Sequence, residues 1–178
     1  LTLNESELKK LLSDENQIWA VTTNMRMLHA LRQEIKQIEK RVSQQVELKS
    51  EYQLLRDIDG IGLILSLTIM LETGDISRFA SVGNYASYCR CVNSTKISNN
   101  KKKGEGNTKN GNKYLAWAYI EAANFAIRFN PDAKSFYQRK AAKTKRVVAL
   151  KATAHKLARA CYFVMKNQEP FDSARLFH

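Results

Sequence analysis

The feature that most restricts the fold is a long N-terminal segment with helical periodicity and no helix breaker. Residues 1–50 contain no Gly or Pro. Apolar side chains recur there in steps of three or four residues, at Ile18, Val21, Met25, Leu28, Leu31, Ile35, Ile38 and Val42. This spacing places an apolar stripe along one face of a long helix. The step from Leu28 to Leu31 departs from strict heptad phase, so a coiled coil is compatible with the pattern without being required. We expect the stripe to pack against another subunit or against the rest of the chain.

The remaining sequence also predicts helices. Its 7 Gly and 2 Pro among 178 residues argue against a turn-rich β fold. Helical patterns flank Gly60–Gly62, cover 113–129 and extend from 132 to 166, and no segment predicts a strand. We expect the last helix to bury Phe136, Val147, Leu150, Ala154, Leu157, Cys161 and Met165. Trp19, Trp117 and the tyrosines are also expected in the core, with Tyr114 able to stack on a base instead.

We therefore predict an all-α protein, with a long coiled-coil-like N-terminal helix followed by a compact helical domain that contains a helix-hairpin-helix. The expected boundaries are a connector at 1–50, the compact domain at 51–172 and a tail at 173–178. Because the chain begins at Leu1 and not at Met, we expect it to be a piece of a longer protein.

Several functional classes are disfavoured by what the sequence lacks. No window of about 18 apolar residues exists and no secretory signal precedes the helix, so we expect a cytoplasmic protein that does not span a membrane. Cys89, Cys91 and Cys161 form no C-x-x-C pair and are expected to be reduced packing residues. The three histidines are too far apart in sequence for a metal site, and none is expected within this chain.

The positive charge is concentrated in the C-terminal part. Residues 1–100 carry 12 Lys and Arg against 12 Asp and Glu, whereas residues 101–178 carry 17 against 5. A cluster of this kind favours a polyanionic partner, since binding releases the counterions condensed on nucleic acid. An anionic membrane surface is the weaker alternative, because the basic segment has no dense apolar face. A merely solvated basic surface is the other alternative, and the charge favours nucleic acid over it.

The turn Gly60-Ile61-Gly62 lies between two apolar helical patterns. With Leu55, Ile58 and Ser66 in register, it matches the helix-hairpin-helix pattern, in which backbone amides at a helix N-terminus bind a phosphate. Ser66 occupies the small-residue position that allows the two helices to approach. The alternative is an ordinary turn between helices.

A polar stretch at 93–112 has Ile97 as its one apolar side chain. Long connections of this kind are usually functional or disordered, and we expect a mobile, lysine-rich loop. Ser98 is followed by Lys101, Lys102, Lys103 and two glycines, a setting that suits attack on a phosphodiester because cations offset the phosphate charge. No base or metal ligand is adjacent in sequence, so the residues alone leave a plain loop serine as the alternative.

Several motifs in a fixed order carry a family resemblance. They are Gly60-Ile-Gly, Gly74-Asp75, Arg78-Phe79, Tyr85-Ala-Ser-Tyr-Cys, Ser98-Asn-Asn-Lys-Lys-Lys-Gly-Glu-Gly-Asn, Lys109-Asn-Gly-Asn-Lys-Tyr-Leu, Tyr137-Gln-Arg-Lys and Ala154-His-Lys-Leu-Ala-Arg. Together they resemble the C-terminal transposase domain of the insertion-sequence-110 family, in its 1111-type branch (IS116/IS110/IS902), over about residues 50–172. Arg90-Cys91 replaces the Gly-Leu of many members.

The resemblance implies a DNA recombinase that uses a serine nucleophile and a structured RNA from its element. The family serine falls on Ser98, with Ser94 as the less favoured choice. Full-length members also carry a RuvC-like domain with four acidic metal ligands. That domain is not in this sequence, so the expected divalent metal, Mg²⁺, would be held elsewhere and no cofactor is expected here.

The predicted function is the C-terminal half of a transposase that binds DNA and a structured guide RNA as a homo-oligomer assembled through the N-terminal helix. Ser98 is the expected nucleophile. The expected nucleic-acid contacts are Gly60, Gly62, Lys101, Lys102, Lys103, Lys109, Lys113, Arg139, Lys140, Lys143, Lys145 and Arg146. The alternatives are a noncatalytic nucleic-acid-binding module and a coiled-coil assembly module. This part alone is expected to be inactive as a nuclease.

Overall fold

The computed structural model describes residue 7 and residues 10–46, 50–92, 95–105, 110–171 and 176–177. The chain divides into two units, Leu1–Gln45 and Val46–His178, and each is described by itself.

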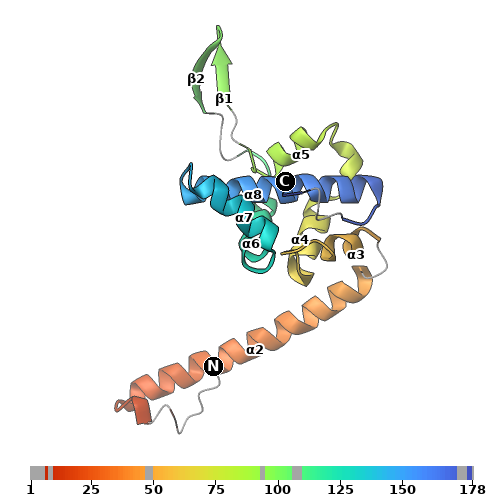
Figure 1. Cartoon of the computed structure of the whole chain (residues 1–178). Helices are drawn as coiled ribbons and strands as arrows, with labels where there is room; N and C mark the ends of the chain where they lie inside the picture. Colours follow the sequence, from red (N-terminus) through yellow and green to blue (C-terminus); the bar gives the residue numbers. More distant parts are fainter. Residues whose placement is uncertain are drawn as a thin grey trace. The chain divides into compact units, whose positions relative to one another are not determined.

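The first unit is essentially one helix, α2, which spans Glu15–Val46 (Figure 1). Its start is capped by Asp14, whose carboxylate accepts a hydrogen bond from the Asn16 amide at 2.8 Å. The predicted long helix is confirmed. The prediction that Trp19 is a core residue is wrong, because its side chain is 69% exposed. The reason is that, among the described residues of this unit, no second layer covers that side of α2.

The second unit is a helical domain with α8 at its centre (Figure 1). Its helices are α3 (Ser50–Arg56), α4 (Leu63–Thr73), the 3₁₀ turn η1 (Ile76–Arg78), α5 (Val82–Tyr88), α6 (Lys113–Phe129), α7 (Pro131–Ala141) and α8 (Arg146–Asn167). α8 contacts α3, α5, α6 and α7, and α4 packs on α6. The predicted all-α class is therefore confirmed, and the helix expected at 113–129 has the predicted bounds.

The core contains buried tyrosines whose hydroxyls are paired. The Tyr85 hydroxyl lies 2.6 Å from that of Tyr119 and 2.9 Å from Thr73 Oγ1. Tyr162 donates to the Phe79 carbonyl oxygen at 3.3 Å. Pairing of this kind removes most of the cost of burying a hydroxyl. The core prediction is thus confirmed for Tyr52, Tyr85, Tyr119 and Tyr162, whereas Tyr88 and Tyr137 are half-buried and Tyr114 is exposed.

Two other core predictions are wrong. Trp117 is 49% exposed on α6, and Val147 is 75% exposed in the first turn of α8. The helix expected at 132–166 is in fact two helices, α7 and α8, separated by 142–145. Thr144 donates to the Lys140 carbonyl oxygen at 2.8 Å, and Lys145 is extended, which ends one helix and starts the next. Val147 consequently lies at a corner and not in a helix interior.

The polar stretch contains a β-hairpin that the sequence did not predict. β1 (Thr95–Ser98) pairs antiparallel with β2 (Lys101–Glu105), with Ser98 opposite Lys101 and a register shift between Lys96 and Ile97. Asn99 and Asn100 have φ values of 52° and 57°, as a two-residue type I′ turn requires. Asn tolerates this left-handed conformation. The hairpin lacks the alternating apolar residues that reveal most strands, which explains the missed prediction.

Candidate nucleic-acid interface

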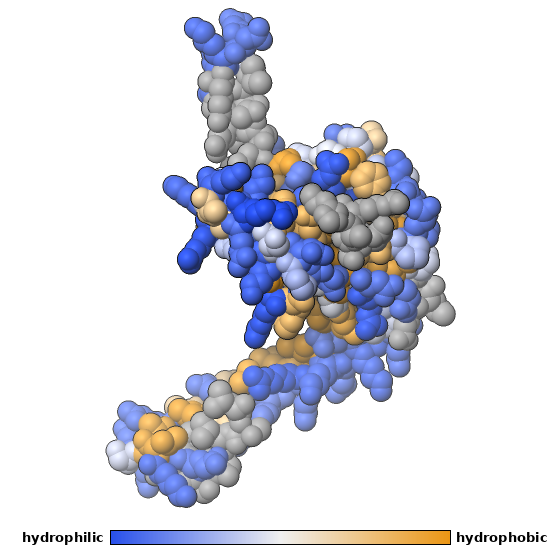
Figure 2. Space-filling model, viewed as in Figure 1, coloured by the Kyte–Doolittle hydropathy of each residue, from blue (hydrophilic) through white to orange (hydrophobic). Residues whose placement is uncertain are grey.

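Ser98 is the last residue of β1, immediately before the hairpin turn. It is exposed, and so are Lys101 and Lys103 on β2. Directly opposed residues in an antiparallel pair have Cβ atoms about 4.5–5.5 Å apart, so the backbone register places Lys101 beside Ser98. Figure 2 shows the hydrophilic residues gathered at the hairpin tip. A phosphate that reached the serine would therefore meet a lysine at the same place.

For the other predicted residues of the polar stretch, the structure gives a backbone position for Lys102 alone. Lys102 pairs with Ile97 through its backbone. Lys109 and the alternative serine, Ser94, lie outside the described residues.

A pair of contacts closes the base of the polar stretch. Arg90 donates to the Gly111 carbonyl oxygen through Nε at 3.2 Å and Nη2 at 2.8 Å. The Asn112 amide donates to the Tyr88 carbonyl oxygen at 2.7 Å. Gly111 has a φ of +93°, and a Cβ there would lie 2.4 Å from the Tyr88 oxygen. Residues 90 and 111, which bracket the stretch that carries Ser98, are thus held together. Sequence reasoning missed this role for Arg90, because its partner is 21 positions away.

Asn112 links this base to the helices around it. Its Oδ1 accepts from the amides of Tyr114 at 2.8 Å and Leu115 at 3.0 Å, which caps α6. Its Nδ2 donates to Glu72 Oε2 at 2.7 Å. The pKa of the Tyr88 hydroxyl is lowered by two hydrogen bonds, of which the one from Arg78 has the larger effect and the one from Asn112 the smaller. Hydrogen bonds of Asn112 therefore connect the base of the polar stretch to α4 and α6.

The two glycines of the 60–62 turn have different surroundings. Gly60 has a φ of +91°, and a Cβ there would lie 2.4 Å from the Ala122 carbonyl oxygen of α6. Gly62 precedes α4, has open space within 4 Å of where a Cβ would lie, and provides no side-chain cap for that helix. Gly60 thus serves close packing, whereas the first-turn amides of α4 have no side-chain acceptor from their cap. The turn borders a groove of ≈ 620 Å³ whose lining includes Trp117, Phe125 and Phe129.

The predicted cations of the C-terminal part gather at one corner. Arg139 and Lys140 end α7, Lys143 and Lys145 lie in the connection, and Arg146 begins α8. All five are exposed. Arg139 Nη2 also donates to the Phe177 carbonyl oxygen at 3.2 Å. Lys113, at the start of α6, is exposed with Nζ 4.9 Å from the Tyr114 ring centroid.

Comparison with known proteins identifies the central region of the chain. Residues 52–138 match the family described as Transposase IS116/IS110/IS902. This region carries the similarity to that transposase family. The predicted family is confirmed, and the assignment to its 1111-type branch stays a prediction. The matched transposase region contains the glycine turn, the hairpin and the Arg90–Gly111 contact, and it ends before the α7–α8 corner.

A curated relative comes from an insertion element that the family description also names. The chain is 24% identical over 118 residues to the insertion element IS110 uncharacterized 43.6 kDa protein of Streptomyces coelicolor. The match covers 66% of this chain and 29% of the relative. The chain therefore spans less than a third of that protein's length.

Metal sites, membrane spans and reactive thiols were also sought in the described residues. Within the described ranges, no three His, Cys, Asp or Glu side chains gather closely enough to hold a metal ion together. No helix in the same ranges is long and apolar enough to cross a bilayer. All three cysteines are free and buried, and burial raises the pKa of Cys91 and of Cys161 to about 12. They are packing residues, as predicted.

Proposed function

We propose that this chain is the DNA-handling part of an insertion-element transposase and that Ser98 attacks a DNA phosphodiester. The observation that carries the proposal is an exposed serine at a hairpin tip, opposite Lys101, on a segment whose base is held by Arg90. An exposed tip can enter a groove or meet a displaced strand, which a serine in the helical core could not do.

The proposed step is a transesterification. Ser98 Oγ forms a bond to phosphorus, the bond from phosphorus to one deoxyribose oxygen breaks, and that oxygen leaves as a hydroxyl after taking up a proton. The product is a phosphoserine ester that a second sugar hydroxyl can resolve, which rejoins DNA. Lys101 and Lys103 would offset charge on the phosphate as the transition state forms.

The described residues do not supply every group that this step needs. The serine proton must pass to a base, and the carboxylates that would hold a divalent metal are expected from another part of a longer protein. No step is assigned to a metal in this chain. The part described here would accordingly bind nucleic acid without cutting it.

Binding would depend on the basic corner between α7 and α8, whose five exposed cations can neutralise backbone phosphates. The uncapped start of α4 offers amides to one further phosphate. A structured RNA is the second proposed partner, on the family resemblance, and shares the same electrostatic requirement.

We also propose that the chain forms a homo-oligomer through α2. The supporting observation is a row of exposed apolar residues along that helix, with Leu31 61%, Ile35 52% and Ile38 60% exposed. Burial of such a row against a second copy is the usual source of stability in helical dimers.

The test uses the full-length transposase with a DNA substrate and denaturing electrophoresis. Ser98→Ala should keep DNA affinity and lose the covalent protein–DNA adduct, whereas Ser94→Ala should retain it. An adduct formed by Ser98→Ala would exclude Ser98 as the nucleophile. The second candidate function, a noncatalytic binding module, is favoured by the position of Ser98 beside the Asn99–Asn100 turn, where it can shape the hairpin. An adduct that forms in both variants would support this function for the chain, because the attacking residue would then lie elsewhere in the transposase.

A further inference from the structure

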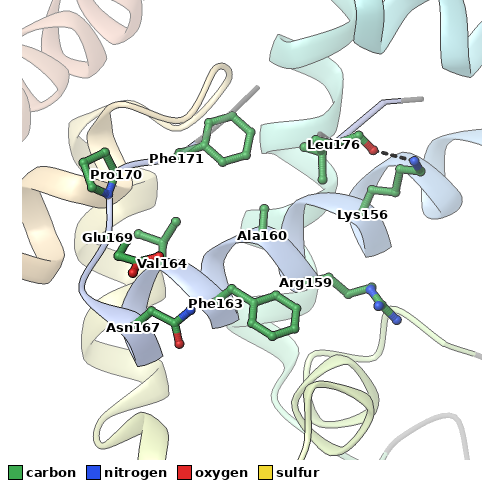
Figure 3. Close-up of a pocket in the computed structure, with 10 residues that line it drawn as sticks. All are labelled: Lys156, Arg159, Ala160, Phe163, Val164, Asn167, Glu169, Pro170, Phe171 and Leu176. Atoms are coloured by element: carbon green, nitrogen blue, oxygen red, sulfur yellow. Dashed lines mark hydrogen bonds between the residues drawn. The ribbon is translucent and has the colours of Figure 1, made fainter. Parts of the chain in front are cut away.

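A pocket outside the family-matched region has the chemistry of a nucleotide site. It lies between the C-terminal half of α8 and the segment that follows that helix, with a volume of ≈ 480 Å³ (Figure 3). This volume is within the range of about 300–1,000 Å³ that small-molecule sites occupy. Its lining residues all lie after residue 138, beyond the end of the matched transposase domain.

One face of α8 presents a cation, an aromatic ring and an amide in a column. Arg159, Phe163 and Asn167 are spaced four residues apart and so follow one another at each helical turn. Phe163 is 45% exposed, although Val164 beside it is 5% exposed. The Tyr162 ring supports Phe163 edge-on, with centroids 5.3 Å apart and an interplanar angle of 82°. The exposed ring is thus held in place by the core.

Positive charge gathers at one end of this column. Lys156 and Arg159 line that end, and the Lys156 ammonium donates to the Leu176 carbonyl oxygen, as Figure 3 shows. Burial, followed by the nearby charges of Arg139, Arg159 and Lys140, lowers the pKa of Lys156. Cations crowded in this way repel one another and gain when an anion joins them.

The opposite end of the pocket is polar without excess positive charge. Asn167, one helical turn after Phe163, and Glu169, which follows the end of α8, lie there (Figure 3). Asn167 can donate and accept hydrogen bonds at the edge of a base, and Glu169 can accept from an exocyclic amine. An anion is therefore favoured at the Arg159 end and a neutral, hydrogen-bonding ring at the Asn167 end.

We propose that this pocket holds one unpaired nucleotide of a bound nucleic-acid strand, with its phosphate at Arg159 and its base on the Phe163 ring. The inference rests on the proposed nucleic-acid binding and specifies a second type of contact within it. A duplex keeps its bases stacked in the helix, so its backbone can use the basic corner without entering the pocket. Stacking on a phenylalanine accepts any base, because every base has a π face.

The test measures the affinity of the 178-residue chain for a single-stranded oligonucleotide and for a duplex, by fluorescence anisotropy at one salt concentration. Phe163→Ala should weaken single-strand binding about tenfold, a typical loss for one stacked base, and change duplex binding by less than about twofold. Phe163→Tyr should retain both affinities. Thermal melting of each variant checks that the fold is kept.

A matched pair of arginine variants tests the phosphate contact. Arg159→Gln should weaken single-strand binding more than Arg128→Gln, which removes an exposed cation from the end of α6. Single-stranded DNA and RNA of one sequence are compared in parallel, and a Phe163→Ala loss with either strand supports the site and identifies which strand it takes.

The outcomes separate this inference from the proposed function. If the wild-type chain binds both nucleic acids and Phe163→Ala changes neither affinity, or weakens both equally, the pocket is not a nucleotide site while the proposed function stands. If the wild-type chain binds neither, both are overturned. A photo-crosslink from a 5-iodouracil oligonucleotide should map to the peptide that contains Phe163, and a crosslink confined to other peptides would contradict the site.

Discussion

Gly60 and Gly62 are two residues apart in one turn, but the structure uses them differently. Gly60 needs its left-handed backbone and its missing side chain, because the α6 backbone occupies the space that a Cβ would fill. Gly62 has an ordinary φ of −84° and open space around it. A turn that the sequence suggested for phosphate binding therefore also joins two helices tightly.

Substitution by alanine should separate these roles. Gly60→Ala should lower the free energy of unfolding by about 2 kcal/mol or more, because it combines a strained φ with a steric clash. Gly62→Ala should change it by less than about 0.5 kcal/mol. Urea unfolding followed by circular dichroism measures both. Equal effects of the two substitutions would contradict the close approach of Gly60 to α6.

For single residues, the sequence predicted which side chains suit phosphate chemistry better than it predicted where side chains lie in the fold. Ser98 and its lysines could be selected because their residue types suit phosphate chemistry. The Arg90–Gly111 contact could not, since a long-range pair depends on how α5 and α6 meet. Val147 was expected in the core because its spacing is helical, but a helix corner exposes it.

Among the elements, the β-hairpin depends on two residues with left-handed backbone. Asn100→Val should disfavour the turn by about 1–2 kcal/mol, since a β-branched residue tolerates positive φ poorly. Asn100→Gly should preserve the turn. Cross-strand nuclear Overhauser effects between β1 and β2 would report the hairpin population. Retention of these signals in Asn100→Val would contradict the type I′ geometry.

The apolar row on α2 makes a separate prediction about assembly. Ile35→Lys should weaken self-association at least tenfold, because it places a charge within an apolar contact. Gln33→Lys, on the opposite face of the same helix, should have little effect. Sedimentation velocity over a concentration series measures the association. A wild-type chain that stays monomeric at high concentration would contradict assembly through α2.

The elements also show where periodicity is sufficient evidence. The helix at 113–129 follows from its apolar spacing and from the Asn-Pro pair that ends it. The break between α7 and α8 was missed because residues 142–145 contain no Gly or Pro, and the hydrogen bond from the Thr144 side-chain hydroxyl to the Lys140 carbonyl oxygen supplies the stop. The hairpin was missed because its signal is turn geometry and not hydrophobic alternation.

For the whole molecule, the uneven charge predicts a salt-dependent affinity. Lys140→Gln, Lys143→Gln and Arg146→Gln together should reduce the slope of log K against log salt for duplex DNA by about 1 for each phosphate that is no longer neutralised. The matched triple variant Lys36→Gln, Lys40→Gln and Arg41→Gln removes the same charge from α2 and should change the slope less. Fluorescence anisotropy titrations supply the slopes. Equal reductions would contradict a localised interface.

The buried thiols predict how stability changes at alkaline pH. Burial raises the pKa of Cys91 and of Cys161 to about 12, above the ordinary value near 9. The unfolded chain loses these protons first, so stability is full below about pH 9 and falls as pH rises toward 12, by up to about 1.4 kcal/mol per pH unit for each thiol. Cys161→Ala should therefore show a shallower decline between about pH 9 and 11 in denaturant unfolding. An unchanged slope would contradict the buried thiol's contribution.

The proposed chemistry of the whole transposase depends most on the identity of the attacking oxygen. The direct measurement is tandem mass spectrometry of the covalent product formed by the full-length transposase with DNA, after digestion of protein and nucleic acid. We expect a nucleotide remnant esterified to Ser98 in the peptide that spans the hairpin turn. A remnant on any other residue, Ser94 included, would contradict the proposal.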